Sequence, residues 1–405
     1  MKVLMLSNYY KPEITASSHL GQDRREAFSE AGFNMVLYTP VPTRGISAQV
    51  REEYSHRLYE VELDGKLHVH RFPLMREGKN PIQRAFRYFL SICKLYRAAR
   101  REKNVDVLFI GSTPPINGLM FHGIRKKLNC KIVYNLQDVF PDSLVTTGMT
   151  KKGSLLWRIG RKIENVTYSY ADRIIVISQS MKRNIMAKGV PEEKIEVISN
   201  WIDTDAVKPV AKEDNRLYEE FSIDREKFTV VYAGNFGAAQ GAEVVLECAK
   251  CLPDVQFVIF GGGAGFDSAR KTAESLPNVI INNLLPQERV PEVYSLGDVC
   301  LITCKKGVGT SGMPSKTWSI MACNTPIVAA FDTDSELAEI IEEANAGICV
   351  EPENADLLVK AITETQKNIT QYAGGRAYAC QNASKTVCVK KYVDVLKTQV
   401  ESKDG

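Results

Sequence analysis

The chain has 405 residues, too many for one ordinary hydrophobic core, so we expect two domains of about 200 residues each. Its 44% hydrophobic and 25% charged residues are typical of a globular protein, and no apolar run reaches the roughly 20 residues of a membrane span. Residues 1–200 hold 32 Lys and Arg against 19 Asp and Glu, whereas the remainder holds 20 against 29. This excess of 13 positive charges in the first half predicts an anionic partner: a membrane surface, a phosphorylated substrate or nucleic acid.

In the first half, apolar strand-like segments alternate with helical ones. Strands are expected at 3–6, 35–38, 107–110, 131–135 and 173–177, and helices at 18–31, 80–103, 116–128, 153–170 and 179–187. Residues 40–66 give only a weak signal. Alternating strands and helices predict a parallel sheet with helices on both faces.

The second half repeats this rhythm after an irregular hinge at 201–209. Its strands are expected at 229–233, 256–260, 279–281, 299–303 and 327–330, with helices at 242–250, 264–275, 287–296, 314–323 and 335–343. We therefore predict an α/β protein of two Rossmann-like, doubly wound domains facing a cleft, covering 1–203 and 204–384. A C-terminal helix at about 385–405 is expected to pack back on the first domain.

The ten cysteines lie mostly inside apolar segments, and residues 1–30 contain no signal-peptide core, which favours a cytosolic protein with reduced thiols. Cys248 and Cys251 lack the loop context of a zinc site. The Asp-x-Asp triplets at 203–205 and 332–334 are typical of metal-dependent transferases of another fold, but the first lies in the hinge. We expect no metal.

Residues 307–316 are a candidate anion site. Gly309 and Gly312 favour a loop, Pro314 suits a first helical turn, and Ser315 and Lys316 follow at the helix start, where free N–H groups bind anions. The plain alternative is a connector with one exposed lysine. Two other helix starts allow the same two interpretations, a phosphate site or an ordinary turn or cap: Gly262 and Gly263 after one strand, and Ser335 and Glu336 after another.

Taken in order and spacing, five stretches resemble the retaining glycosyltransferases of family 4, which have the GT-B fold. They are residues 9–18, 172–178, 199–203, 232–235 and 314–330. The resemblance is to the bacterial subgroup that builds capsule, O-antigen and exopolysaccharide, and within it to transferases of N-acetylated amino sugars such as N-acetyl-fucosamine. It implies transfer of a sugar, without a cofactor, from a UDP-linked donor to a polyprenyl-diphosphate-linked saccharide.

The chain departs from the family at its usual donor contacts. Ser311 and Ser319 stand where the family commonly has two glutamates, and Asn235 and Gln240 where it often has Arg and Lys. Lys316 is then the best remaining cation for a diphosphate. The predicted donor site comprises Gly234, Asn235, Gly237, Gly262, Gly263, Ser311, Ser315, Lys316, Ser319, Ser335 and Glu336.

Catalytic roles are predicted for Lys316 and for two acids of the first domain. Asp138 follows the strand at 131–135, near where the family often has a histidine motif, and Glu13 lies in the loop after the first strand. A helix cap for Asp138 and a plain turn around Glu13 are the alternatives. Two other functions stay open: a nucleotide-sugar epimerase on the same scaffold, or a catalytically silent sugar- or lipid-binding subunit.

The helix at 81–103 carries seven Arg and Lys and one Glu, with aromatic residues at helical spacing. We predict that Arg84, Arg87, Lys94 and Arg97 face an anionic membrane, which makes the protein peripheral to the inner, cytoplasmic face. The alternative is that Phe86, Phe89, Leu90, Cys93 and Tyr96 pack on the sheet beneath a solvated basic face. No nucleic-acid partner is expected.

Overall fold

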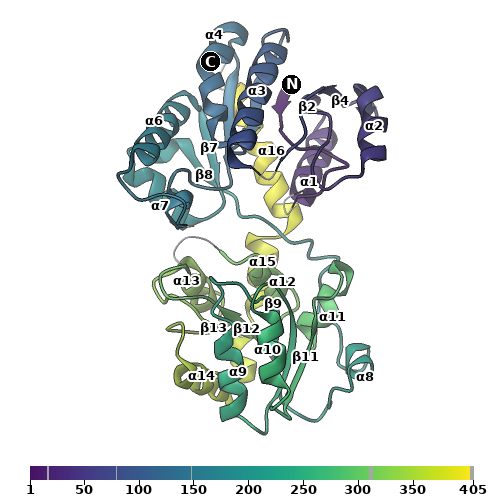
Figure 1. Cartoon of the computed structure of the whole chain (residues 1–405), viewed down its shortest axis with the longest axis vertical. Helices are drawn as coiled ribbons and strands as arrows, with labels where there is room; N and C mark the ends of the chain where they lie inside the picture. The colour runs from purple at the N-terminus through teal and green to yellow at the C-terminus, as the bar shows by residue number, and fades with distance from the viewer. Residues whose placement is uncertain (16–17, 79, 147, 310–312, 402–405) are drawn as a thin grey trace. The chain divides into compact units, whose positions relative to one another are not determined.

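The computed structural model describes residues 1–15, 18–78, 80–146, 148–309 and 313–401. The chain forms two compact units, the first made of Met1–Ser199 with Val389–Gly405 and the second of Asn200–Cys388. Each is a sheet of mainly parallel strands with helices around it (Figure 1), so the predicted class of two Rossmann-like α/β domains is confirmed. None of the described helices is both long enough and apolar enough to cross a membrane.

The described residues of the first unit form an eight-stranded sheet in the order β3-β4-β2-β1-β5-β6-β7-β8. All neighbours are parallel except β3, which pairs antiparallel with β4 at the edge. The strands are β1 Lys2–Leu6, β2 Asn34–Pro40, β3 Tyr59–Glu62, β4 Leu67–Phe72, β5 Val107–Gly111, β6 Lys131–Leu136, β7 Arg173–Val176 and β8 Ile195–Val197. The central strands are apolar on both sides because helices cover both faces.

The helices of this unit are α1 Ser18–Glu30, α2 Ala48–His56, α3 Pro81–Ala99, η1 Pro115–Met120, α4 Phe121–Leu128, α5 Asp142–Thr146, α6 Leu155–Tyr170, α7 Gln179–Ala187, η2 Glu192–Lys194 and α16 Lys385–Glu401. The region of weak signal holds α2, whose start is capped by Ser47, and the edge strand β3. The last helix begins in the second unit and ends in the first.

Helices α3, α4, α6 and α7 share one core on one face of the first sheet. Leu95, Phe121, Tyr168 and Ile185 come from these four helices in turn and are all buried there. The 3₁₀-helix η1 contacts both α3 and α6 and so joins them into one layer. On the opposite face, Tyr392 of α16 packs edge-on against Phe109 at 6.1 Å.

The described residues of the second unit form a fully parallel six-stranded sheet in the order β11-β10-β9-β12-β13-β14. Its strands are β9 Thr229–Asn235, β10 Gln256–Gly262, β11 Val279–Asn283, β12 Val299–Thr303, β13 Ile327–Ala330 and β14 Gly347–Val350. Its helices are α8 Leu217–Glu220, α9 Glu243–Cys251, α10 Phe266–Ala273, η3 Gln287–Arg289, α11 Val290–Ser295, α12 Lys316–Ala322, α13 Glu336–Glu343, α14 Ala355–Lys367, η5 Ile369–Tyr372 and α15 Gly375–Asn382.

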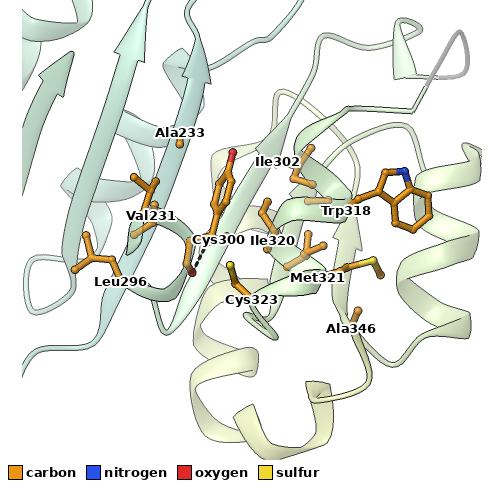
Figure 2. Close-up of a cluster of buried hydrophobic side chains, with 14 of the residues drawn as sticks. Val231, Ala233, Leu296, Cys300, Ile302, Trp318, Ile320, Met321, Cys323 and Ala346 are labelled. Atoms are coloured by element: carbon orange, nitrogen blue, oxygen red, sulfur yellow. Dashed lines mark hydrogen bonds between the residues drawn. The ribbon is translucent and has the colours of Figure 1, made fainter. Parts of the chain in front are cut away.

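Helix α12 is held in place by the core of the second unit. Trp318, Ile320 and Met321 of this helix belong to one buried cluster with Val231 and Ile302 of the sheet (Figure 2). Because Ile320 and Met321 are fully buried, the helix has little freedom to rotate. The sheet therefore fixes the direction in which Lys316, the first residue of α12, leaves the helix.

Candidate active site

A cavity of about 580 Å³ lies in the second unit, at the carboxyl ends of β9, β10 and β12. Ligands of doubly wound sheets bind at this end of the strands. Four of the predicted donor residues line it: Gly234, Asn235, Ser315 and Lys316. The rest of the lining is mainly apolar and includes Leu284, Leu285, Val290, Val293, Met313 and Phe331.

Lys316 brings a positive charge to this cavity. Its Nζ donates to the carbonyl oxygen of Ala233 at 3.3 Å and lies 4.2 Å from the centre of the Tyr232 ring. No carboxylate of the described residues faces this ammonium group, and burial lowers its pKa to about 8. Lys316 is thus a partly buried cation held by a carbonyl and a ring, and the alternative of an exposed surface lysine is wrong.

Gly234 makes room for that lysine. A Cβ at Gly234 would lie 3.1 Å from Lys316 Nζ and 3.3 Å from the Tyr232 hydroxyl. The hydroxyl itself donates to the carbonyl oxygen of Asn235 at 3.0 Å, which fixes the end of β9. Tyr232 therefore positions both the lysine and the loop, a role that its place in an apolar strand did not reveal.

The glycine loop after β10 supports the cavity without lining it. Gly263 has φ of +98°, and a Cβ there would fall 1.7 Å from Asn235 Oδ1, so only glycine fits against that side chain. Backbone hydrogen bonds tie Phe236 to Gly262 at 2.7 Å and Gly265 to Phe236 at 2.8 Å. Gly262 and Gly263, like Gly237, thus hold the loop that carries Asn235 and do not line the cavity.

Asp332 anchors the loop that precedes α12. Its carboxylate accepts hydrogen bonds from the backbone N–H groups of Gly307 at 2.8 Å and Gly309 at 2.7 Å. The sequence singled out this aspartate only as part of a metal-like triplet. The described residues contain no group of three potential metal ligands, and Asp332 uses both oxygens on the backbone.

The other predicted donor residues lie apart from the cavity or outside the described residues. Ser335 is buried, and its hydroxyl caps α13 by accepting from Ala338 N at 3.4 Å. Glu336 lies in the first turn of α13, and Ser319 lies on α12 half-buried. Neither lines the cavity. Ser311 lies outside the described residues.

A second cavity, of about 560 Å³, lies in the first unit at the carboxyl ends of β1, β5 and β6. Glu13 lines it, is buried, and accepts from the backbone N–H groups of Thr43 and Arg44, both at 2.7 Å. Burial raises the pKa of this carboxyl, while the backbone hydrogen bonds oppose the rise. Glu13 therefore holds the loop at 43–44 against the cavity wall.

Asp138 is exposed just beyond β6. It does not line the cavity, whereas its neighbour Gln137 does. The Gln137 amide donates to Asn135 Oδ1 at 3.1 Å, and the Tyr392 hydroxyl donates to the same oxygen at 2.9 Å. At this strand end, Asn135 and Gln137 therefore line the cavity, and Asp138 does not.

The predicted membrane-facing residues of α3 divide into two sets. Arg84, Lys94 and Arg97 are exposed, but Arg87 is only 1% exposed, so placing it on the outer surface is wrong. Arg87 donates to Met75 O at 3.2 Å and to the Thr43 hydroxyl at 3.1 Å. Its position coincides with the inner face of the helix, where Ser91 and Leu95 follow at four-residue spacing.

The alternative in which the apolar stripe of this helix packs on the sheet is also wrong for its two phenylalanines. Phe86 is 55% and Phe89 57% exposed, and Ile82 beside them is 80% exposed. The helix packs instead through Ile92, Leu95 and Ala99. Helix α3 therefore has one apolar face on the sheet and a second one in solvent.

Comparison with known proteins identifies the chain. Residues 25–206 match the family model "Glycosyltransferase Family 4", and residues 214–379 match "Glycosyl transferases group 1". The chain is 30% identical over 332 residues to the "Probable glycosyltransferase WbjE" of Pseudomonas aeruginosa, covering 79% of this chain and 82% of the relative. The chain is a family-4 glycosyltransferase.

A second curated relative and one solved structure are also similar to the chain. The glycosyltransferase is 26% identical over 407 residues to the "Putative colanic acid biosynthesis glycosyl transferase WcaI" of Escherichia coli, covering 97% of this chain and 99% of the relative. Its fold is similar to that of HepE of Anabaena, solved in complex with UDP, with a TM-score of 0.71 at 15% identity over 98% and 100% of the two chains. The cavity around Lys316 lies wholly inside the segment matched at 214–379.

Proposed function

We propose that this glycosyltransferase moves a sugar from a UDP-linked donor to a hydroxyl of a polyprenyl-diphosphate-linked saccharide during synthesis of a cell-surface polysaccharide. The structural neighbour from Anabaena was solved with UDP, and the Escherichia coli relative is named for colanic acid biosynthesis. We further propose that the transferred sugar is an N-acetylated amino sugar, because the sequence resembles transferases of such sugars. The observation that carries the proposal is the Lys316 ammonium group, directed at the cavity with no carboxylate of the described residues beside it.

In this proposal the second unit binds the donor, and Lys316 stabilises the leaving diphosphate. The bond between the sugar C1 and the phosphate oxygen breaks, and a bond from C1 to the acceptor oxygen forms on the same face. The acceptor hydroxyl gives its proton to the leaving phosphate oxygen, so UDP is released and no strong side-chain base is needed. Charge stabilisation of the diphosphate supplies most of the acceleration.

The reaction is tested by incubating the purified protein with a panel of UDP-sugars, with and without lipid-diphosphate-linked saccharides, and by analysing products by mass spectrometry. UDP release together with a glycosylated lipid is the expected result. Epimerisation of the donor without an acceptor would instead indicate a nucleotide-sugar epimerase. Donor binding without turnover on every native acceptor would indicate a silent binding subunit.

We further propose that the first unit binds the inner leaflet of an anionic membrane through its α3–η1–α6 layer, which makes the enzyme a peripheral cytoplasmic protein. Exposed apolar side chains lie on all three elements: Ile82, Phe86 and Phe89 of α3, Leu119 of η1, and Leu155, Leu156 and Ile159 of α6. Exposed basic residues flank them, including Arg84, Lys94 and Arg97 on α3 and Arg158 and Lys162 on α6.

Acidic residues are nearly absent from the α3–η1–α6 layer and from the neighbouring helix α4. Among the described residues of α3, η1, α4 and α6, the single acidic side chain is Glu164, which is buried and paired with Lys188 at 2.9 Å. A basic surface with exposed aromatic side chains suits anionic lipid, where each Lys or Arg near the surface contributes about 1 kcal/mol. A lipid-linked acceptor would be reached from such a position.

A further inference from the structure

Two arginine side chains converge in the wall of the first unit's cavity. Arg24 and Arg25 both line it, and a Cβ at Gly21 would lie 3.1 Å from Arg25 Nη1 and 3.9 Å from Arg24 Nη2. Burial lowers the pKa of Arg25, and the charge of Arg24 lowers it further, while the neighbouring Tyr10 opposes these effects. Two cations this close raise each other's energy unless an anion lies between them.

Aromatic rings hold the guanidinium groups in place. Arg25 lies 4.7 Å from the centre of the Tyr10 ring, and Arg24 lies 5.1 Å from that of Tyr392. A third lining arginine, Arg44, lies 5.5 Å from the Tyr9 ring. A guanidinium stacked on a ring keeps its edge N–H groups available, and that edge matches a carboxylate or a phosphate.

Two acidic residues near Arg25 and Arg44, Glu62 and Glu13, bind other groups. Glu62 contributes a favourable charge to Arg25, but its carboxylate binds Lys11 and the Tyr10 hydroxyl, both at 2.8 Å. Glu13, the acidic residue among those lining the described cavity, binds the backbone at 43–44. By count, the described lining holds the cationic residues Lys11, Arg24, Arg25 and Arg44 and one acidic residue, Glu13.

A buried amide in the same wall also points to a ligand. Asn8 lines the cavity, is 1% exposed, and neither its Nδ2 nor its Oδ1 has a hydrogen-bond partner among the described residues. A buried amide left unpaired costs about 1–3 kcal/mol, so such groups are found where a ligand completes the bonding. Asn8 therefore adds an amide NH2 donor group and an amide oxygen acceptor to the lining that also contains the three arginines.

We propose that this cavity recognises an anionic group on the acceptor, a phosphate or a carboxylate, held by Arg24, Arg25 and Arg44 with Asn8 as a hydrogen-bonding partner. This inference rests on the proposed transferase function and specifies its acceptor. The anion has two possible sources, the diphosphate of the lipid carrier or a uronic acid in the saccharide. The same arginines would bind either one.

Calorimetry on the full chain tests the proposal, with saturating UDP present so that the nucleotide cavity is filled. The probes are inorganic pyrophosphate and glucuronate, with glucose as the uncharged control. At least one anion should bind with one-to-one stoichiometry, and glucose should bind more weakly. Binding of pyrophosphate alone indicates the lipid diphosphate, and binding of glucuronate alone indicates an acidic sugar. If neither anion binds while UDP does, the proposal is wrong and the donor site stands; if UDP does not bind, the proposed function itself fails.

Variants locate the bound anion. Arg25→Gln and Arg44→Gln should each weaken anion binding about tenfold or more, the loss expected for a charge-assisted hydrogen bond. Gly21→Ala keeps every charge and favours the helix, but its methyl group displaces the Arg25 guanidinium and should also weaken anion binding. Arg101→Gln, at an exposed position after α3 and outside the cavity lining, is the matched control and should bind the anion as the wild type does. Equal anion affinity in the wild type, Arg25→Gln and Gly21→Ala would overturn the proposal.

Discussion

Replacing Lys316 by methionine isolates the contribution of its charge to donor binding. Methionine keeps an unbranched apolar chain over the Tyr232 ring, so the packing at 4.2 Å is largely conserved while the ammonium group is lost. A charge-assisted contact is worth about 1.5–3 kcal/mol, so the Kd for UDP-glucose should rise by about ten- to 150-fold. The unliganded variant should be no less stable than the wild type, because the buried charge opposes folding.

The lowered pKa of Lys316 gives this effect a characteristic pH dependence. With a pKa of about 8, the free enzyme is mostly protonated at Lys316 at pH 7 and mostly neutral at pH 9. The diphosphate favours the protonated form, so wild-type affinity should fall as pH rises through 8, by up to about tenfold per unit. The Lys316→Met variant has no proton to lose there and should bind equally at both values.

Isothermal titration calorimetry with UDP-glucose between pH 7 and pH 9 measures both effects. Lys250→Met, which removes an exposed lysine at the end of α9 in the same unit, is the matched control and should behave as the wild type. Equal affinity in the wild type and Lys316→Met would place the diphosphate elsewhere. A parallel pH dependence in both proteins would assign the titration to another group.

Three further outcomes follow from the contacts described above. Glu13→Gln keeps an oxygen acceptor for the two backbone N–H groups at 43–44 and removes a buried charge, so its Tm at pH 7 should equal or exceed that of the wild type. Glu13→Ala removes the acceptor and should lower the free energy of unfolding by about 1–3 kcal/mol. A lower Tm in Glu13→Gln than in Glu13→Ala would contradict this reasoning. Asp332→Ala should lower the free energy of unfolding, measured with urea, by about 1–3 kcal/mol and should weaken UDP binding, because two loop N–H groups lose their acceptor. Unchanged UDP affinity would show that this loop does not shape the site. The double variant Phe86→Ser and Phe89→Ser should reduce flotation with anionic liposomes without lowering Tm, because both side chains are exposed. Arg87→Gln should lower Tm because the Arg87 side chain is buried and hydrogen-bonded. Equal binding of the wild type to neutral and anionic vesicles would refute membrane docking by charge.

The fold could be predicted because each strand is an apolar run and the helices between them are periodic. The edge element β3 was harder, because Tyr59–Glu62 alternates partly exposed and exposed residues and carries two glutamates. Helix α3 shows the limit of periodicity, since a helix with two apolar faces has no single stripe to assign. Arg87 looked like a surface residue because arginine usually is one, and only its partners Met75 and Thr43 reveal why it is buried.

The candidate site was predictable where local chemistry determines it and not where distant segments meet. Lys316 after Pro314 signals an anion site within one short segment. Asp332, by contrast, bonds to residues more than 20 positions earlier in the chain, and no spacing rule connects them. The pair Arg24 and Arg25 is visible in the sequence as two adjacent arginines. The close approach of both guanidinium groups to Gly21 and the unpaired amide of Asn8 appear only when β1 and α1 are placed together.

The return of the chain into the first unit has a consequence for synthesis. Tyr392 closes the sheet face over Phe109 and donates to Asn135, yet it is translated only after the whole second unit. On the ribosome, residues 1–199 must therefore wait with an uncovered apolar patch while the second unit is being made and folded. A fragment ending at Ser199 would keep that patch permanently, so a separable first unit requires the α16 segment to be supplied with it, either fused through a new linker or added as a peptide.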